Sequence, residues 1–331
     1  MTALQQIHFP DKRKEANQAR KSFAFRDLFL LQLKNLEQKR ELRKQKAYPI
    51  KYELEDIKNI LNALPFELTL TQKKSLWEIL QDITNPHPMN RLLQGDVGSG
   101  KTIIAGITAV IAVSPPNNLQ AAFMAPTEIL ARQHYLTLTK FFSGFEGGIG
   151  LLGAKEARMF YGDGLETPVK KQQFIKEAGE GKIKIIIGTH ALIQKNVSFN
   201  NLGLVFVDEQ HRFGVRQRAY LVGRGQKELM PHLLSMSATP IPRTLMMIVF
   251  GSLDLSLITE LPRGRKPIIT KIVDPANRDK AYAFIRGEVR KGKQVFVVCP
   301  RIETMDKEQE TREEIQKLEI KSVKDEYEKL S

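Results

Sequence analysis

Eight consecutive residues in the first third of the chain have the pattern of a phosphate-binding loop. They fit the spacing G-x-x-x-x-G-K-[ST], in which glycines let the backbone turn tightly and point successive N–H groups at an anion. The lysine of this pattern contacts the β- and γ-phosphates of a nucleotide, and the hydroxyl that follows binds Mg²⁺. We therefore expect a nucleotide site formed by Gly95, Asp96, Val97, Gly98, Ser99, Gly100, Lys101 and Thr102.

Two adjacent carboxylates follow a strongly apolar segment in the second half of the chain. Asp208 and Glu209 come directly after Leu204–Val207, and active sites of open parallel sheets lie where strands end. Asp208 is expected to hold Mg²⁺ through its water shell, and Glu209 to orient and deprotonate the attacking water. Such a pair can be structural, but a phosphate-binding loop earlier in the chain favours the catalytic interpretation.

Four further polar residues are candidates for the same site. The Gln72 amide can donate to and accept from an adenine edge at once, although such a residue is also typical of a helix surface. Ser237 and Thr239 follow the apolar segment Leu233–Met236 and could couple the phosphate site to a neighbouring domain. His211 could hydrogen-bond across to them, although a single histidine is more often simply packed or exposed.

Two short polar segments have the chemistry of a nucleic-acid backbone contact. Each follows an apolar run and would present N–H groups and a hydroxyl at the start of a helix, where phosphate oxygens bind. The alternative is helix capping, for which Thr127 and Thr189 are well suited. The candidates are Pro126, Thr127, Arg132, Gly188, Thr189 and His190.

These residues need a sheet whose strands end at one edge. Apolar runs predict strands, and the intervening segments predict helices, so the fold class is α/β with a parallel sheet covered on both faces. The glycine-rich stretches 144–153 and 162–164 are predicted surface loops. The predicted strands are 90–93, 121–125, 184–187, 204–207 and 233–236, and the predicted helices include 53–64, 71–83 and 128–142.

The chain is predicted to have three parts. Residues 1–48 form a linker containing one long basic amphipathic helix, 20–46, whose apolar face must dock elsewhere and whose charges are either solvated or close to nucleic acid. Residues 49–262 form the phosphate-binding domain. Residues 263–331 begin a second α/β domain, with strands 268–273 and 294–298 around helix 278–291, and Cys299 at the end of a buried strand.

Composition limits the class of protein and its partners. The chain has 331 residues and a net charge of +14, which favours polyanionic partners, above all nucleic acid. No apolar run approaches the roughly 20 residues that span a bilayer, so we expect no membrane contact and a cytoplasmic location. The single cysteine excludes an intramolecular disulfide.

Taken in order, these motifs resemble helicase superfamily 2, and within it the RecG family of ATP-dependent DNA helicases. The resemblance covers most of the chain, from about Ile7 to Glu303. It rests on the entry segment 66–69 with Gln72, on 93–102, on 125–131 (APTEILA), on 188–193 (GTHALI), on 208–215 (DEQHRFGV) and on 237–244 (SATPIPRT).

The resemblance implies a function and a fold. The motor would be RecA-like, would use ATP and Mg²⁺, and would remodel branched double-stranded DNA such as stalled forks and Holliday junctions. Lys101, Asp208 and Glu209 would be catalytic. The resemblance also implies a monomer that is cytoplasmic and nucleoid-associated, with single-strand-binding protein as a partner.

Two departures from the family pattern matter. Leu152-Gly153-Ala154 stands where the family usually has Thr-Gly-Ser, which removes two hydroxyls from an expected phosphate contact. The family's N-terminal wedge domain and its later motor motifs are not found in the sequence, so we expect a fragment with weak or no ATP hydrolysis of its own. The alternatives are a half motor that only binds nucleotide and DNA, and a P-loop enzyme of another class such as a small-molecule kinase.

Overall fold

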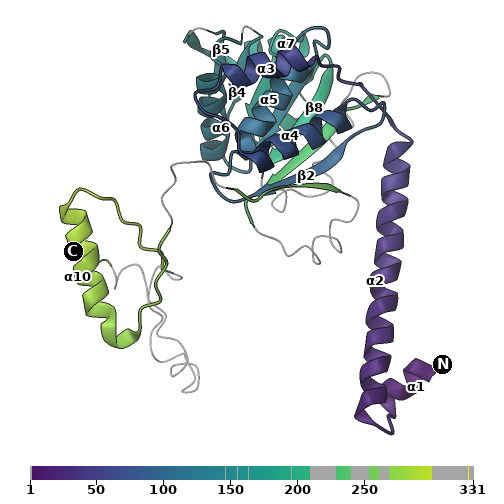
Figure 1. Ribbon diagram of the computed structural model, residues 1–331. Helices are drawn as coiled ribbons and strands as arrows, with labels where there is room; N and C mark the ends of the chain where they lie inside the picture. The colour runs from purple at the N-terminus through teal and green to yellow at the C-terminus, as the bar shows by residue number, and fades with distance from the viewer. Residues whose placement is uncertain are drawn as a thin grey trace. The chain divides into compact units, whose positions relative to one another are not determined.

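The computed structural model describes residues 2–145, 147–154, 156–162, 164–194, 196–208, 229–239, 253–260, 268–299 and 327. The chain divides into two compact units, Met1–Arg265 and Lys266–Ser331. The first unit holds the sheet (Figure 1), and its range includes every described candidate site residue. The boundaries of the three predicted parts remain predictions.

The first unit is built on a sheet that has nine strands in the described residues, in the order β11-β2-β10-β8-β3-β7-β4-β5-β6. Neighbouring strands are parallel from β11 to β4, while β5 pairs antiparallel with both β4 and β6. The strands are β2 (Asn90–Gly95), β3 (Gln120–Met124), β4 (Ile149–Leu152), β5 (Ala157–Phe160), β6 (Glu166–Val169), β7 (Ile185–Gly188), β8 (Leu202–Asp208), β10 (His232–Ser237) and β11 (Asp254–Ile258).

Helices cover both faces of this sheet, because its strands are apolar on both sides. Alternate residues of β3 separate into two cores: Ala121 and Phe123 belong to one, and Ala122 and Met124 to the other. The first core also contains residues of α3, α4, α5 and α6, of which α4 and α5 lie in front of the sheet in Figure 1. The second contains residues of α7 and η1. The bounds are α3 (Leu54–Asn62), α4 (Leu70–Ile83), α5 (Lys101–Val113), α6 (Glu128–Phe141), α7 (Lys171–Gly179) and η1 (His190–Ile193).

The predicted parallel sheet is confirmed where the sequence had long apolar runs. The five predicted strands correspond to β2, β3, β7, β8 and β10, and the three predicted helices to α3, α4 and α6. Runs such as Leu204–Val207 are buried along their whole length, and continuous burial of this kind is what a central parallel strand requires.

The prediction that 144–153 is a surface loop is wrong. β4 lies within this stretch, and all four of its residues are buried. A Cβ on Gly150 would lie 2.6 Å from the Phe174 ring of α7, so this glycine lets the helix pack closely on the strand. In the second glycine-rich stretch, the described residues Gly162 and Gly164 do lie outside the strands, between β5 and β6.

Near the N-terminus, α1 (Thr2–His8) precedes the long helix α2 (Arg13–Arg43). The predicted long basic helix is confirmed, but it begins earlier and ends earlier than 20–46. Lys39 of α2 donates to Asp254 of β11 over 2.6 Å. The apolar side chains of Phe25, Phe29 and Leu36 are exposed, and the surface on which they dock remains a prediction.

After α2 the chain is joined to the sheet at the amino-terminal edge of its strands. β1 (Lys46–Ala47) pairs with β9 (Leu229–Met230). His232, the first residue of β10, is fully buried. Its Nδ1 accepts from Met89 N–H at 3.0 Å, so its Nε2–H donates to the Tyr48 carbonyl at 2.7 Å. Burial lowers the pKa of His232 to about 4.

The second unit contains η3 (Pro275–Asn277) and α10 (Arg278–Arg290), which confirms the predicted helix. The predicted strands 268–273 and 294–298 are wrong, because the described residues there form no strand. Ile272 and Phe296 are 101% and 89% exposed. An isolated apolar run gains no ladder hydrogen bonds without a pairing strand. Cys299 is accordingly only half-buried instead of ending a buried strand.

In the part of the chain that the structure describes, no helix is both long enough and apolar enough to cross a membrane.

Candidate nucleotide-binding site

The predicted phosphate-binding loop joins β2 to α5 at the carboxyl end of the strand. Gly98 and Gly100 have φ angles of +77° and +92°, the left-handed region that favours glycine. A Cβ on Gly100 would also lie 2.4 Å from the Gln72 amide nitrogen. The strand, turn and helix expected around the motif are therefore present, and two of its glycines are required by the backbone.

Lys101 lies over the loop to which it belongs. Its ammonium donates to the carbonyl oxygens of Gly95 at 2.7 Å and Asp96 at 3.0 Å. The charged group is thus held within the curve of the loop, close to the amides that would contact phosphate. Its contact with β- and γ-phosphates remains a prediction.

Gln72 connects the start of α4 to the phosphate-binding loop. It is 3% exposed. Its side-chain oxygen accepts from Thr69 N–H at 2.8 Å, and its nitrogen donates to the Ser99 carbonyl at 2.7 Å. Thr69 and Gln72 form a capping box. Each end of the amide therefore already has a partner within the chain, and adenine recognition by Gln72 stays a prediction.

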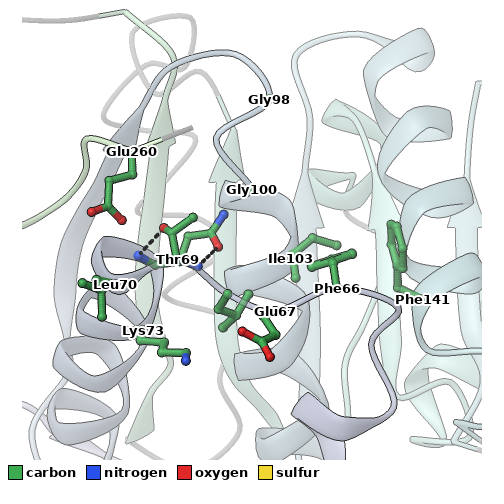
Figure 2. Close-up of a pocket in the computed structure, with 12 residues that line it drawn as sticks. Phe66, Glu67, Thr69, Leu70, Lys73, Gly98, Gly100, Ile103, Phe141 and Glu260 are labelled. Carbon is green, nitrogen blue, oxygen red and sulfur yellow. Dashed lines mark hydrogen bonds between the residues drawn. The ribbon is translucent and has the colours of Figure 1, made fainter. Parts of the chain in front are cut away.

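A cavity of about 730 Å³ lies beside this junction, within the size range of small-molecule sites. Figure 2 shows Phe66 and Phe141 at one end of it and Glu260 at the other. The two aromatic rings meet edge to face with centroids 5.4 Å apart. The lining comes from the α4 entry segment and α4, the loop, α5, the end of α6 and the segment after β11: Phe66, Glu67, Leu68, Thr69, Leu70, Gln72, Lys73, Gly98, Gly100, Ile103, Phe141 and Glu260.

Glu260 was not among the site residues predicted from the sequence. Its carboxylate accepts from the Thr71 N–H at 3.1 Å and the Thr71 hydroxyl at 3.2 Å. The N–H of Thr71 holds the pKa of Glu260 below its ordinary value. A single glutamate after a short strand has no sequence signal for this contact, because Thr71 lies 189 positions earlier.

The two halves of the predicted metal site lie on either side of one strand. Asp208 ends β8, Gly95 ends β2, and β10 runs between these strands in parallel register with both. His134 of α6 bridges the gap: its Nε2 is 2.8 Å from Asp208 Oδ2, and its Nδ1 is 3.4 Å from the Thr102 hydroxyl. His134 was not predicted from the sequence, while Glu209 and His211 lie outside the described residues.

The predicted coupling residues Ser237 and Thr239 are close to the phosphate-binding loop. Their hydroxyls are 3.0 Å apart, and the Gln94 side chain donates to the Thr239 carbonyl at 3.0 Å. Gln94 immediately precedes Gly95, so this bond links the end of β10 to the start of the loop. The role of this segment in coupling remains a prediction.

The candidate DNA-contacting segments lie next to one another, at the carboxyl ends of β3 and β7. β3 and β7 are parallel neighbours with Met124 opposite Gly188, and Ala125 N–H donates to the Gly188 carbonyl at 2.9 Å. The Thr127 hydroxyl accepts from Leu130 N–H at 3.3 Å, which is the capping alternative. Thr189 makes no side-chain cap bond.

Both capping and DNA contact therefore stay open for these segments. Arg132 and His190 are exposed. The departure at 152–154 begins at the last residue of β4, next to β7, and continues into the segment after the strand, where Ala154 N–H donates to the Glu128 carboxylate. Contact of these segments with DNA remains a prediction.

The parallel sheet and its glycine-rich strand-to-helix loop define a RecA-like P-loop domain. The sequence model of the DEAD/DEAH box helicase family matches residues 69–248, more than half of the chain. The chain therefore belongs to the DEAD/DEAH box helicase family, and this membership implies nucleotide use.

The chain is similar to proteins named ATP-dependent DNA helicase RecG. It is 43% identical to the protein of Aquifex aeolicus, over 93% of this chain and 36% of that protein. It is 42% identical to the protein of Synechocystis sp., over 100% of this chain and 37% of that protein. It also matches a solved structure of RecG bound to a three-way DNA junction, with a TM-score of 0.76 and 39% identity, over 89% of this chain and 38% of that one. The chain thus spans well under half the length of these relatives.

Proposed function

We propose that this chain is the ATP-binding part of a RecG-type DNA helicase that remodels branched DNA. The observation that carries the proposal is the approach of Thr102 and Asp208, each within 3.4 Å of His134, beside a well-formed phosphate-binding loop. The relatives named ATP-dependent DNA helicase RecG support the DNA substrate.

The residues present fit a magnesium ion. Mg²⁺ takes oxygen ligands, keeps several waters, and usually binds one or two protein groups together with phosphates. The Thr102 hydroxyl and the Asp208 carboxylate are such oxygen donors, and both face the same imidazole. When bound, the ion would neutralise charge that develops on the phosphates during hydrolysis.

Each residue has a proposed part in ATP hydrolysis. The loop amides and Lys101 bind the phosphates, while Thr102 and Asp208 orient the metal. Gln72 and the neighbouring cavity accept adenine. Glu209, assigned from sequence alone, deprotonates the water that attacks in line.

The proposed DNA contacts are the segments after β3 and β7. Pro126, Thr127, Gly188, Thr189 and His190 offer amides and polar side chains at one edge of the sheet, and Arg132 adds charge. The net charge of +14 supports an electrostatic contribution. Binding should weaken steeply as salt rises.

The remaining parts of the proposal come from the family resemblance and the sequence. They are a motor domain at 49–262 with a second domain beginning at 263, a monomer, single-strand-binding protein as a partner, and a cytoplasmic, nucleoid-associated location.

A second candidate is a half motor that binds nucleotide and DNA without hydrolysing ATP alone. One observation favours it: described residues 268–299 form one α-helix and no strand. In motors of this kind an arginine from a second domain completes the ATP site. This arginine is typically worth about 10³–10⁵-fold in the rate of ATP hydrolysis.

The deciding experiment is Mg²⁺-ATP hydrolysis by the purified chain, with and without a forked DNA. Lys101→Ala is the blank. Lys176→Ala on α7, an exposed lysine, is the matched control. Hydrolysis that is stimulated by DNA and lost only in Lys101→Ala supports the helicase proposal. Nucleotide binding without hydrolysis supports the half motor, and absence of nucleotide binding contradicts both.

A further inference from the structure

One buried histidine bridges the two predicted metal ligands and has no part in the proposed chemistry so far. His134 lies in the middle of α6, and its side chain is 8% exposed, against 13% for Asp208. Its two ring nitrogens approach different functional side chains: Asp208 lies 74 positions away in sequence, and Thr102 lies 32 positions away. The bridge is therefore tertiary and belongs to neither motif.

The chemistry of the partners selects one tautomer of the ring. An ionised carboxylate only accepts hydrogen bonds, so Nε2 must carry the proton that it donates to Asp208. Nδ1 of the neutral ring is then an acceptor, and the Thr102 hydroxyl must donate to it. With its proton directed at the imidazole, the Thr102 oxygen keeps its lone pairs for a cation.

The ring is held in place by the core of the sheet. The ring centroids of His134 and Phe123 are 6.4 Å apart, and the Phe123 ring stacks on the Phe206 ring with centroids 4.0 Å apart. Both phenylalanines are buried, on β3 and β8. The imidazole is thus supported by rigid strands, as a residue that orients others must be.

We propose that His134 is a positioning residue for magnesium, orienting the Asp208 carboxylate and the Thr102 hydroxyl toward one ion. This inference rests on the proposed nucleotide site and deepens it. Residues that hydrogen-bond to metal ligands and orient them typically contribute about 10–100-fold to metal affinity or activity. His134 touches neither phosphate nor reacting water in this proposal, so its effect passes through Asp208 and Thr102.

The test measures how much Mg²⁺ strengthens nucleotide binding, without any turnover. A fluorescent ADP analogue is titrated into the full chain with Mg²⁺ and with EDTA. The quantity compared between variants is the dissociation constant in EDTA divided by the dissociation constant in Mg²⁺. In His134→Ala the ratio should fall about 10-fold or more, while affinity in EDTA stays within about twofold. Gln133→Ala, a neighbouring exposed residue of α6, should keep the ratio of the original chain.

Two amide substitutions separate the two contacts. A glutamine amide reaches about as far as Nε2, so His134→Gln can still donate to Asp208. An asparagine amide reaches only about as far as Nδ1, so His134→Asn can contact Thr102 alone. Because the contact to Asp208 is the shorter, at 2.8 Å against 3.4 Å, glutamine should restore more of the ratio than asparagine.

The inference is overturned if His134→Ala keeps the ratio, or if affinity falls equally with Mg²⁺ and with EDTA, as a purely structural role would cause. If His134→Ala does not fold by circular dichroism, the amide variants decide, and equal ratios for glutamine and asparagine overturn the inference. Absence of nucleotide binding by the original chain would instead overturn the proposed function itself.

Discussion

The central sheet has one edge formed by the amino-terminal ends of its strands and one formed by their carboxyl-terminal ends. A buried histidine lies at each of these edges, and the two histidines have opposite kinds of partner. At the amino-terminal edge, His232 joins two backbone groups, Met89 N–H and the Tyr48 carbonyl. At the carboxyl-terminal edge, His134 joins two side chains, those of Thr102 and Asp208. Backbone partners fix the chain path, whereas side-chain partners fix the orientation of functional groups. One edge should therefore govern stability and the other nucleotide chemistry.

The largest effect is expected from His232→Leu, which leaves the buried Met89 N–H and the part-buried Tyr48 carbonyl without their partner. Each unsatisfied group costs about 1–3 kcal/mol, so the free energy of unfolding should fall by about 2–6 kcal/mol. Urea denaturation measures the loss. The Mg²⁺-to-EDTA ratio of nucleotide affinity should stay unchanged below the transition, and a changed ratio would contradict the division between the edges.

The pH dependence of stability tests the same edge without leaving any group unpaired. The folded pKa of His232 is about 4, below its ordinary 6.5. Above pH 6.5 His232 is neutral in both the folded and the unfolded state, and its contribution to stability is fully present. As pH falls toward 4 the unfolded state takes up a proton that the folded state does not, so stability drops by up to about 3 kcal/mol.

The comparison variant for this measurement is His232→Gln, which can hydrogen-bond but does not titrate. The difference in unfolding free energy between the two proteins should change between pH 7 and pH 4. His87 lies close enough to lower the same pKa, so His87→Gln is measured in parallel. A difference that stays constant with pH would mean that His232 is protonated equally in both states.

At the carboxyl-terminal edge, Asp208→Asn should abolish most ATP hydrolysis in a form of the protein that turns over. If an orienting partner is worth about 10–100-fold, removing the ligand charge itself should cost at least about 100-fold. The unfolding midpoint should move little, because Asp208 lies at the end of its strand. Turnover within tenfold of the original protein would remove Asp208 from the proposed metal site.

The smallest effect is expected for Thr127→Ala, which removes the cap of α6. Loss of an N-cap typically costs about 1 kcal/mol of stability. Thr127→Asn keeps a capping oxygen and should recover that stability. If Thr127 also contacts DNA, alanine should weaken binding of forked DNA more than asparagine does. Equal DNA affinities for both variants would leave capping as its only role.

Much of the fold could be predicted from sequence because its central strands are long apolar runs. β7 is buried throughout and β8 is buried except at Asp208, and the phosphate-binding loop has fixed spacing. β4, by contrast, follows a glycine-rich segment and has a glycine in its interior, so its sequence is typical of a loop until Phe174 packs on it. Strands 268–273 and 294–298 were wrong for the complementary reason, since an apolar run forms a strand only when another strand pairs with it.

Site residues differ in the same way, because a contact between residues close in sequence can be predicted and a contact between residues far apart in sequence cannot. Thr69 and Gln72 are three positions apart, so a capping box can be recognised locally. His134 and Asp208 are 74 positions apart, and a single histidine on a helix carries no signal of such a partner. Gln94 with Thr239 and Glu260 with Thr71 were missed for this reason too.

α6 has a consequence for how DNA and nucleotide could influence one another. It begins beside Thr127, a proposed DNA contact, and seven residues later, about 10 Å along the axis, it presents His134 to the metal ligands. If DNA displaces the start of this helix, the imidazole moves with it. Any factor by which DNA changes nucleotide affinity must then equal the factor by which nucleotide changes DNA affinity. The coupling free energy of the motor could thus be determined from two binding curves, before a single ATP is hydrolysed.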